Sequence, residues 1–134
     1  MKSIAECDSA IKLNPKDADA YAELGAVYCS MGQDIKAIED FTKAIALNIK
    51  TKGTTYWYRG IAYANLEQYN EAIEDFTKSI ELGPWDVAYH SRGCSYGALE
   101  KYTQALSDFE AAVRLNPNND EAREKVSILK GMGY

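Results

Sequence analysis

One stretch of this chain occurs more than once. The residues Ala37–Lys43 recur letter for letter at Ala72–Lys78, and a weaker copy stands at Ala105–Ala111. The copies start 35 and 33 residues apart. A period close to 34 residues is typical of stacked arrays, in which each unit buries its apolar face only against its neighbours. We therefore expect a continuous stack whose function lies on the surface that the units share.

A glycine followed three residues later by a tyrosine keeps the same step. The pairs are Gly25 and Tyr28, Gly60 and Tyr63, and Gly93 and Tyr96. Glycine inside a helix costs about 1 kcal/mol relative to alanine. We therefore expect a neighbouring helix to pass too close for a side chain at each glycine. The matching small residues of that neighbouring helix are Ala37, Ala72 and Ala105.

In each unit an aromatic residue, a glycine, a tyrosine and an Ala-x-x-x-Phe segment follow one another, and in two of the three a proline follows. This order resembles the tetratricopeptide repeat. The resemblance covers nearly the whole chain and implies an all-α, right-handed solenoid of stacked antiparallel helix pairs. It implies three full units plus a half unit at each end. The predicted boundaries of this single array are 1–17, 18–52, 53–85, 86–119 and 120–134.

Periodicity and the family pattern predict eight helices joined by short turns. Their expected ranges are 2–13, 18–31, 34–47, 54–66, 69–82, 86–99, 102–115 and 119–130.

In proteins that this chain resembles, the first helix of each unit lines a concave groove that holds a partner's peptide or helix. The residues predicted to bind a partner there are Ala22, Ala26, Cys29, Trp57, Tyr58, Ile61, Ala64, Asn65, His90 and Cys94. Trp57 is the expected anchor, because its small neighbours leave room for a guest side chain. In the alternative, its ring folds over His90 or Tyr58 and only stiffens the stack.

Family members that grip the acidic tails of chaperones use Lys, Arg and Asn side chains as a carboxylate clamp. The matching places in this chain hold Ala22, Ala26, Thr54, Tyr58, Val87 and Ser91. None of these can pair with a carboxylate as a cation does. The expected partner is therefore a protein or peptide of apolar to mildly basic character, and a chaperone tail is disfavoured.

Arg59 and Arg92 stand beside the packing glycines, where an apolar residue is commoner in the family. An aspartate precedes each phenylalanine in the same phase. We predict that the arginines pair with Asp40, Asp75 or Asp108, and the alternative is that they reach the groove and bind ligand.

The two end helices suggest a second function of a different class. Ile4, Cys7 and Ile11 lie at helical spacing with no preceding helix to cover them. Such a strip predicts weak self-association, and hence a structural module that oligomerises through its end helices. The alternative is that the strip packs on Tyr21 and Leu24 of the next helix. A third hypothesis is a targeting domain cut from an enzyme.

Composition narrows the class of partner. The net charge of −5 disfavours nucleic acid, which calls for a basic face. No run approaches the roughly 18 apolar residues of a membrane span. The segment before Ser9 is too polar for a secretory signal core. These features predict a cytoplasmic protein that binds neither nucleic acid nor a membrane.

Catalysis and cofactor binding are not expected. His90 is the single histidine, and the three cysteines show no Cys-x-x-Cys spacing, so they indicate reduced packing thiols and no metal site. His90 and Cys94 lie four residues apart, as a nucleophile and its base could. No orienting carboxylate or oxyanion hole accompanies them, so the sequence predicts a non-enzyme without cofactors.

Overall fold

The computed structural model describes residues 2–134, which fold into α-helices without strands. The helices are α1 (Ile4–Leu13), α2 (Ala18–Ser30), α3 (Asp34–Ala46), α4 (Lys52–Asn65), α5 (Tyr69–Leu82), α6 (Asp86–Ala98), α7 (Tyr102–Leu115) and α8 (Asp120–Gly131). Each predicted helix boundary is confirmed to within two residues. The all-α fold expected from the repeats is therefore the fold observed.

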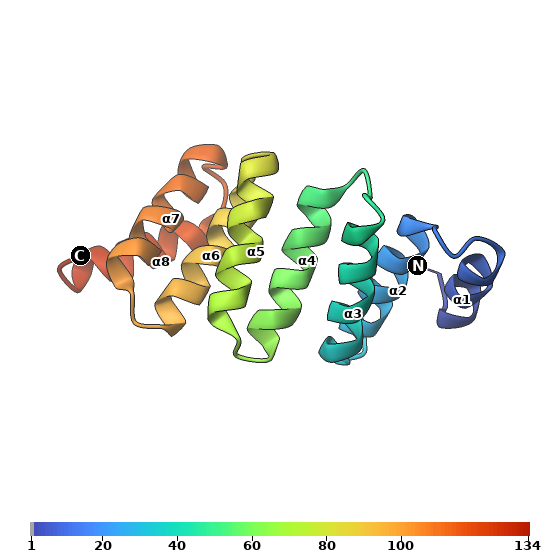
Figure 1. Ribbon diagram of the computed structural model, residues 1–134. Coiled ribbons are helices and arrows are strands. Elements are labelled where there is room, and N and C mark those ends of the chain that lie inside the picture. The colour runs from blue at the N-terminus through green and yellow to red at the C-terminus, as the bar shows by residue number, and fades with distance from the viewer. Residues whose placement is uncertain (1) are drawn as a thin grey trace.

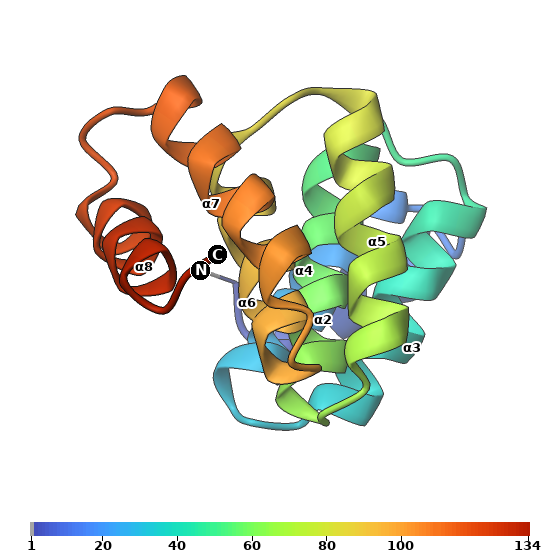
Figure 2. The same cartoon turned by 90° about the vertical axis from the view of Figure 1, so that its left-hand side faces the viewer.

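The helices stack in chain order from α1 at one end of the molecule to α8 at the other (Figure 1). Viewed along the stack, α2, α4 and α6 lie behind one another, with α3 and α5 beside them and α7 in front of α6 (Figure 2). Each first helix contacts its own second helix most extensively, and α4 also touches α2 and α6. We call the layer of α2, α4 and α6 the first-helix wall.

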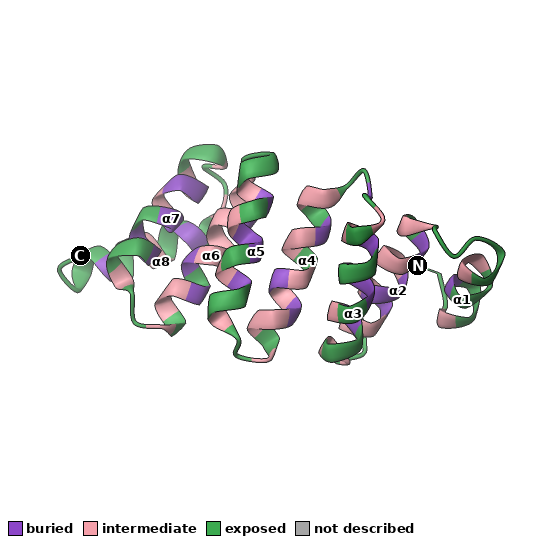
Figure 3. Ribbon diagram, in the orientation of Figure 1, coloured by how far each residue is buried: buried purple, intermediate pink, exposed green. Residues whose placement is uncertain are grey.

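Close approach of the two layers explains the conserved spacing of glycine and phenylalanine within the chain. A Cβ atom on Gly25 would lie 2.7 Å from the ring of Phe41, and one on Gly60 would lie 2.6 Å from the ring of Phe76. A Cβ atom on Gly93 would likewise lie 2.8 Å from the ring of Phe109. The buried surface runs along this seam between the layers (Figure 3).

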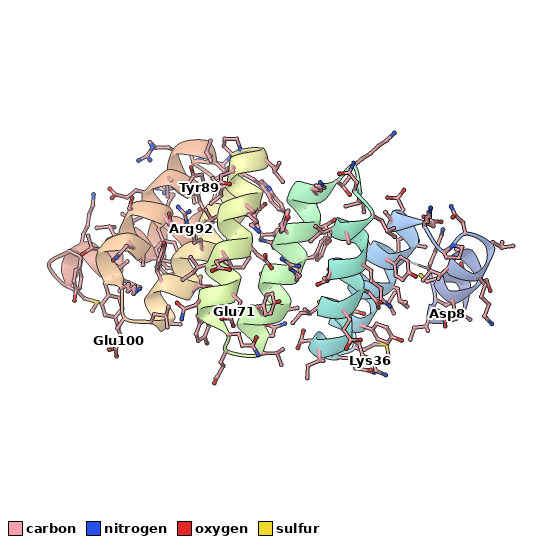
Figure 4. The ribbon with its side chains drawn as sticks, in the orientation of Figure 1. Asp8, Lys36, Glu71, Tyr89, Arg92 and Glu100 are labelled. Carbon is pink, nitrogen blue, oxygen red and sulfur yellow. The ribbon has the colours of Figure 1, made fainter. Side chains whose placement is uncertain are left out.

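Two arginines join three helices each. Arg59 donates to both carboxylate oxygens of Asp75, at 2.8 and 2.7 Å, and its Nη1 donates to Thr42 Oγ1 at 3.2 Å. Arg92 repeats this arrangement with Asp108 at 2.8 and 2.7 Å and with Thr77 at 3.2 Å. The predicted structural pairing is confirmed, and the side chains of Arg92 and Tyr89 lie together on α6 (Figure 4).

The first unit lacks this arginine. Leu24 occupies the place of Arg59 and Arg92, and Asp40, the counterpart of Asp75, is 8% exposed without an arginine partner. Burial raises the pKa of the Asp40 carboxyl to about 6, with Lys43 opposing the rise and Glu39 and Asp8 adding to it. The first unit therefore carries a buried carboxyl without an arginine partner, whereas the corresponding carboxylates of the other two units each pair with an arginine.

The strip of Ile4, Cys7 and Ile11 is not left open to solvent. Cys7 is fully buried, and Ile4 and Ile11 are half-buried where α1 packs on α2. Of the two alternatives, packing of the strip on the next helix is the one observed, because these side chains turn inward onto α2. The outward side of α1 carries Leu13, which is 88% exposed.

Candidate functional site: the first-helix wall

Two hollows follow each other along the first-helix wall. The α2–α4 hollow, with a volume of about 320 Å³, has an apolar floor that includes the predicted residues Ala22, Ala26 and Tyr58. The Tyr58 ring is stacked on Phe41 at a centroid distance of 5.8 Å, which fixes its orientation. Two carboxylates, Asp19 and Glu23, also line this hollow. The hollow thus combines an apolar floor with two carboxylates, of which Glu23 pairs with Lys2 Nζ at 3.3 Å.

The α4–α6 hollow is larger, about 460 Å³, and mostly apolar. The structure brings the predicted residues Ile61, Ala64, His90 and Cys94 together there. The remaining lining residues are Tyr69, Phe76, Val87, Ser91, Ser95, Ala98 and Glu121. Because Ala64 and Ala98 are small, this hollow has room for an apolar side chain of a partner.

Trp57 lines neither of these hollows. Its indole Nε1 donates to Ser91 Oγ at 3.0 Å, and its ring lies edge-on to Tyr58 and Trp85 at centroid distances of 5.0 and 5.1 Å. These contacts tie α4 to α6 and to the turn before it. Trp57 as a whole is half-buried.

Cys29 and Asn65, also predicted to bind, engage Asp34 at the start of α3. Asn65 Nδ2 donates to Asp34 Oδ1 at 3.2 Å, and Cys29 Sγ lies 4.0 Å from the same oxygen. Burial raises the pKa of the Cys29 thiol to about 11, and Asp34 adds to the rise. Neither residue lines the two hollows, so the structure separates them from the other predicted binding residues.

The pair of His90 and Cys94 does not form an activated nucleophile. Burial and the nearby Lys125 lower the pKa of His90, whose ring lies edge-on to Phe109 at a centroid distance of 5.6 Å. Burial raises the pKa of Cys94, so at neutral pH its sulfur is a thiol. No hydrogen bond joins the two side chains. Glu121 Oε2 lies 3.8 Å from His90 Nε2 and adds a carboxylate to the rim.

Some lining residues were not among the predicted binding set. Ile49 and Thr51 reach the α2–α4 hollow from the longer connection between α3 and α4, and Tyr69 reaches the α4–α6 hollow from α5. The unusual Ile49, which replaces the expected proline, was the available signal. Glu124 lines a different hollow, between α7 and α8.

Among the helices of residues 2–134, none has the length and apolar character to cross a membrane.

Profiles of the tetratricopeptide repeat match this chain at residues 56–86 and 87–119, and a second profile of the same description matches residues 6–39. The chain belongs to the tetratricopeptide repeat family. It is 34% identical over 56 residues to cellulose synthase operon protein C of Escherichia coli strain K12. That match covers 42% of this chain and spans only about 5% of the length of the relative, so the similarity is confined to a repeat segment.

Solved structures show the same architecture. MamA superposes with a TM-score of 0.90 at 23% identity, over 97% of this chain and 77% of MamA. The first TPR of Spaghetti (RPAP3), bound to an HSP90 peptide, superposes with a TM-score of 0.81 at 28% identity, over 86% of this chain and 91% of the other. The MamA likeness concerns the fold alone, whereas the second structure holds a peptide.

Proposed function

We propose that this chain is a non-catalytic protein-interaction module that binds an extended segment of a partner along the first-helix wall. The observation that carries the proposal is the succession of two hollows on one wall, each with a floor of small or aromatic side chains. Repeated pockets along an array suit a peptide whose side chains project at regular intervals. The peptide-bound relative supports this mode of binding.

The charges of the wall favour a partner of apolar to mildly basic character. Asp19 and Glu23 line the α2–α4 hollow and Glu121 lines the α4–α6 hollow, whereas neither hollow is lined by lysine or arginine. A basic side chain would pair with these carboxylates, and an acidic tail would be repelled. We therefore propose that this chain does not bind the acidic HSP90 peptide that is bound in the structure of its relative.

A panel of synthetic peptides tests this selectivity. Fluorescence anisotropy would compare heptapeptides that alternate leucine and lysine with matched peptides that carry glutamate in place of lysine. We expect the basic series to bind at least about tenfold more tightly. Asp19→Lys combined with Glu23→Lys should remove this preference, and the equal charge change Glu71→Lys with Glu74→Lys on α5 should not. Tighter binding of the acidic series would contradict the proposal.

Trp57 is proposed as the anchor between the two hollows. Trp57→Ala should weaken peptide binding by about 2 kcal/mol, because it removes the largest partly exposed ring on the wall. Trp57→Phe is the matched variant, since it keeps an aromatic ring and removes the indole N–H that donates to Ser91. Equal binding by wild type and Trp57→Ala, with helicity unchanged in both, would reduce Trp57 to a packing residue.

Self-association through the end helices is the second candidate function. Two further hollows lie at the ends of the stack, one of about 570 Å³ between α7 and α8 and one of about 450 Å³ on α1. These two hollows support the candidate function, because they are open surfaces that lie outside the first-helix wall.

A further inference from the structure

The two end helices are opposite halves of a repeat unit. In the register of the repeats, α1 corresponds to a second helix, with Ala10 at the place of Ala44 and Ala112, and it packs on α2. α8 corresponds to a first helix, with Ala122 at the place of Ala88, and it packs on α7. Within residues 2–134, neither helix meets the other half of its own unit. They lie at opposite ends of the stack, so one copy cannot bring them together (Figure 1).

The two end hollows are lined by the register positions that meet each other inside a complete unit. The hollow beside α8 is lined by Arg123, Val126, Ser127 and Lys130, which match the first-helix positions facing a second helix. The hollow on α1 is lined by Glu6, Ser9, Ala10 and Leu13, which match the second-helix positions facing a first helix. The end surfaces are therefore two halves of one helix-to-helix contact.

The sizes of the side chains at these ends are matched to each other. In each complete unit a glycine faces a phenylalanine ring, and a Cβ atom there would come within 2.8 Å of the ring. At the ends the glycine position holds Ser127, which carries a Cβ atom, and the phenylalanine position holds Cys7. A phenylalanine-bearing helix would clash with Ser127, whereas α1 presents no ring at this place.

The charges at one pair of register positions also change together. In the first two units a second-helix lysine lies over a first-helix tyrosine: Lys43 over Tyr21 at 5.4 Å, and Lys78 over Tyr56 at 5.3 Å. At the ends the tyrosine position holds Arg123 and the lysine position holds Ser9, so no two cations would oppose each other at this place. At the other such place, where Lys36 lies over Tyr28 at 5.4 Å, the ends hold Lys2 and Lys130.

The counterpart of Asp75 adds an attractive pair. Within the second unit, Asp75 of the second helix forms an ion pair with Arg59 of the first helix. At this place α1 carries Glu6, which would face the side of α8 that carries Arg123 and Lys130. Within one copy these two cations lie 4.0 Å from Asp120 and 3.7 Å from Glu110.

We propose that copies of this chain stack head to tail, with α8 of one copy and α1 of the next forming a composite repeat unit. The occupant of each end is a second copy of this chain. The contact would also cover Leu13, which is 88% exposed, whereas its counterparts Leu82 and Leu115 within the array are 57% and 50% exposed. A head-to-tail contact of this kind does not close on itself and extends the stack. This inference rests on the second candidate function and is independent of peptide binding.

Sedimentation velocity of the 134-residue chain over a wide concentration range tests the proposal. The sedimentation coefficient of wild type should rise with concentration at physiological ionic strength. Glu6→Arg alone and Arg123→Glu alone should each weaken association at least tenfold, because like charges would then meet in every contact. An equimolar mixture of the two variants should recover association, since each contact again joins one acidic and one basic side chain.

Matched controls carry the same charge changes within the array. Glu74→Arg on α5 and Lys50→Glu between α3 and α4 are exposed and should associate as wild type does. Circular dichroism checks that all variants fold. A wild type that stays monomeric at every concentration overturns self-association as a whole. Association that the end variants leave unchanged, or a mixture that does not recover, overturns the composite unit specifically. Neither result bears on the peptide measurements.

Discussion

Asp40 shows how a single residue changes the chemistry of one unit. The same carboxylate position is occupied by Asp75 and Asp108, and both receive two hydrogen bonds from an arginine. At Asp40 the arginine is replaced by Leu24, so the buried acid is stabilised in its protonated form. A difference of one side chain thus makes the first unit sensitive to pH.

We expect this residue to lower stability above pH 6. The pKa of Asp40 in the folded chain is about 6, above the ordinary value of 3.8, so the folded state binds more protons between these values. Stability should therefore rise by up to about 3 kcal/mol as pH falls from 7 to 4. The difference between the unfolding free energies of wild type and Asp40→Asn isolates this effect from other carboxylates.

Leu24→Arg provides the complementary measurement. It should restore the pair found in the other units and stabilise the chain at pH 7 more than at pH 4. A wild-type stability that does not differ in pH dependence from Asp40→Asn would contradict the role assigned to this carboxyl.

At the scale of elements, glycine decides how closely two helices approach. Gly60 on α4 has no room for a Cβ atom, which would lie 2.6 Å from Phe76, whereas Gly97 on α6 has nothing within 4 Å. Gly60→Ala should lower the free energy of unfolding by about 1–3 kcal/mol, because overpacking outweighs the gain in helix propensity. Gly97→Ala should raise it by up to about 1 kcal/mol. Equal effects in urea unfolding would refute the close-approach explanation.

The arginine pairs hold three helices together, and their loss should be costly. Arg92→Leu leaves Asp108 buried without a partner and should destabilise the chain by about 3 kcal/mol or more. The double variant Arg92→Leu with Asp108→Leu should be less destabilised, because the isolated charge is removed as well. Thermal unfolding measures both, and an unchanged melting temperature for Arg92→Leu would show that the pair contributes no net stability.

Much of the element level could be predicted from sequence because each feature occurs several times. Three copies of the glycine and phenylalanine spacing specify the helix pairs, and the phase of Arg59 with Asp75 anticipates their contact. The hollows on the wall were less predictable. The ring of Trp57 is oriented by Ser91 of the next unit and by Trp85 in the turn before it, and Ile49 enters from a connection of atypical length. Such contacts depend on the rotation between units, which periodicity alone does not specify.

At the scale of the whole molecule, stability should vary along the stack. Interior helices pack against neighbours on both sides, whereas α1 and α8 pack mainly against one. In arrays of this kind stability is a sum of units and nearest-neighbour interfaces. We expect amide hydrogens of α4 and α5 to exchange most slowly and those of α1 most rapidly. Hydrogen exchange with mass spectrometry on a dilute sample tests this, and uniform protection along the chain would contradict it.

The identity of Ala37–Lys43 and Ala72–Lys78 has a consequence for how the chain reaches its native order. Two helices with the same packing face are interchangeable as docking partners for α2 or α4 during folding. We expect the short turns after α2 and α4 to decide the correct choice, because they bring each helix to its own partner first. On this view the short turns, and not the repeated packing faces, keep α3 and α5 from exchanging places.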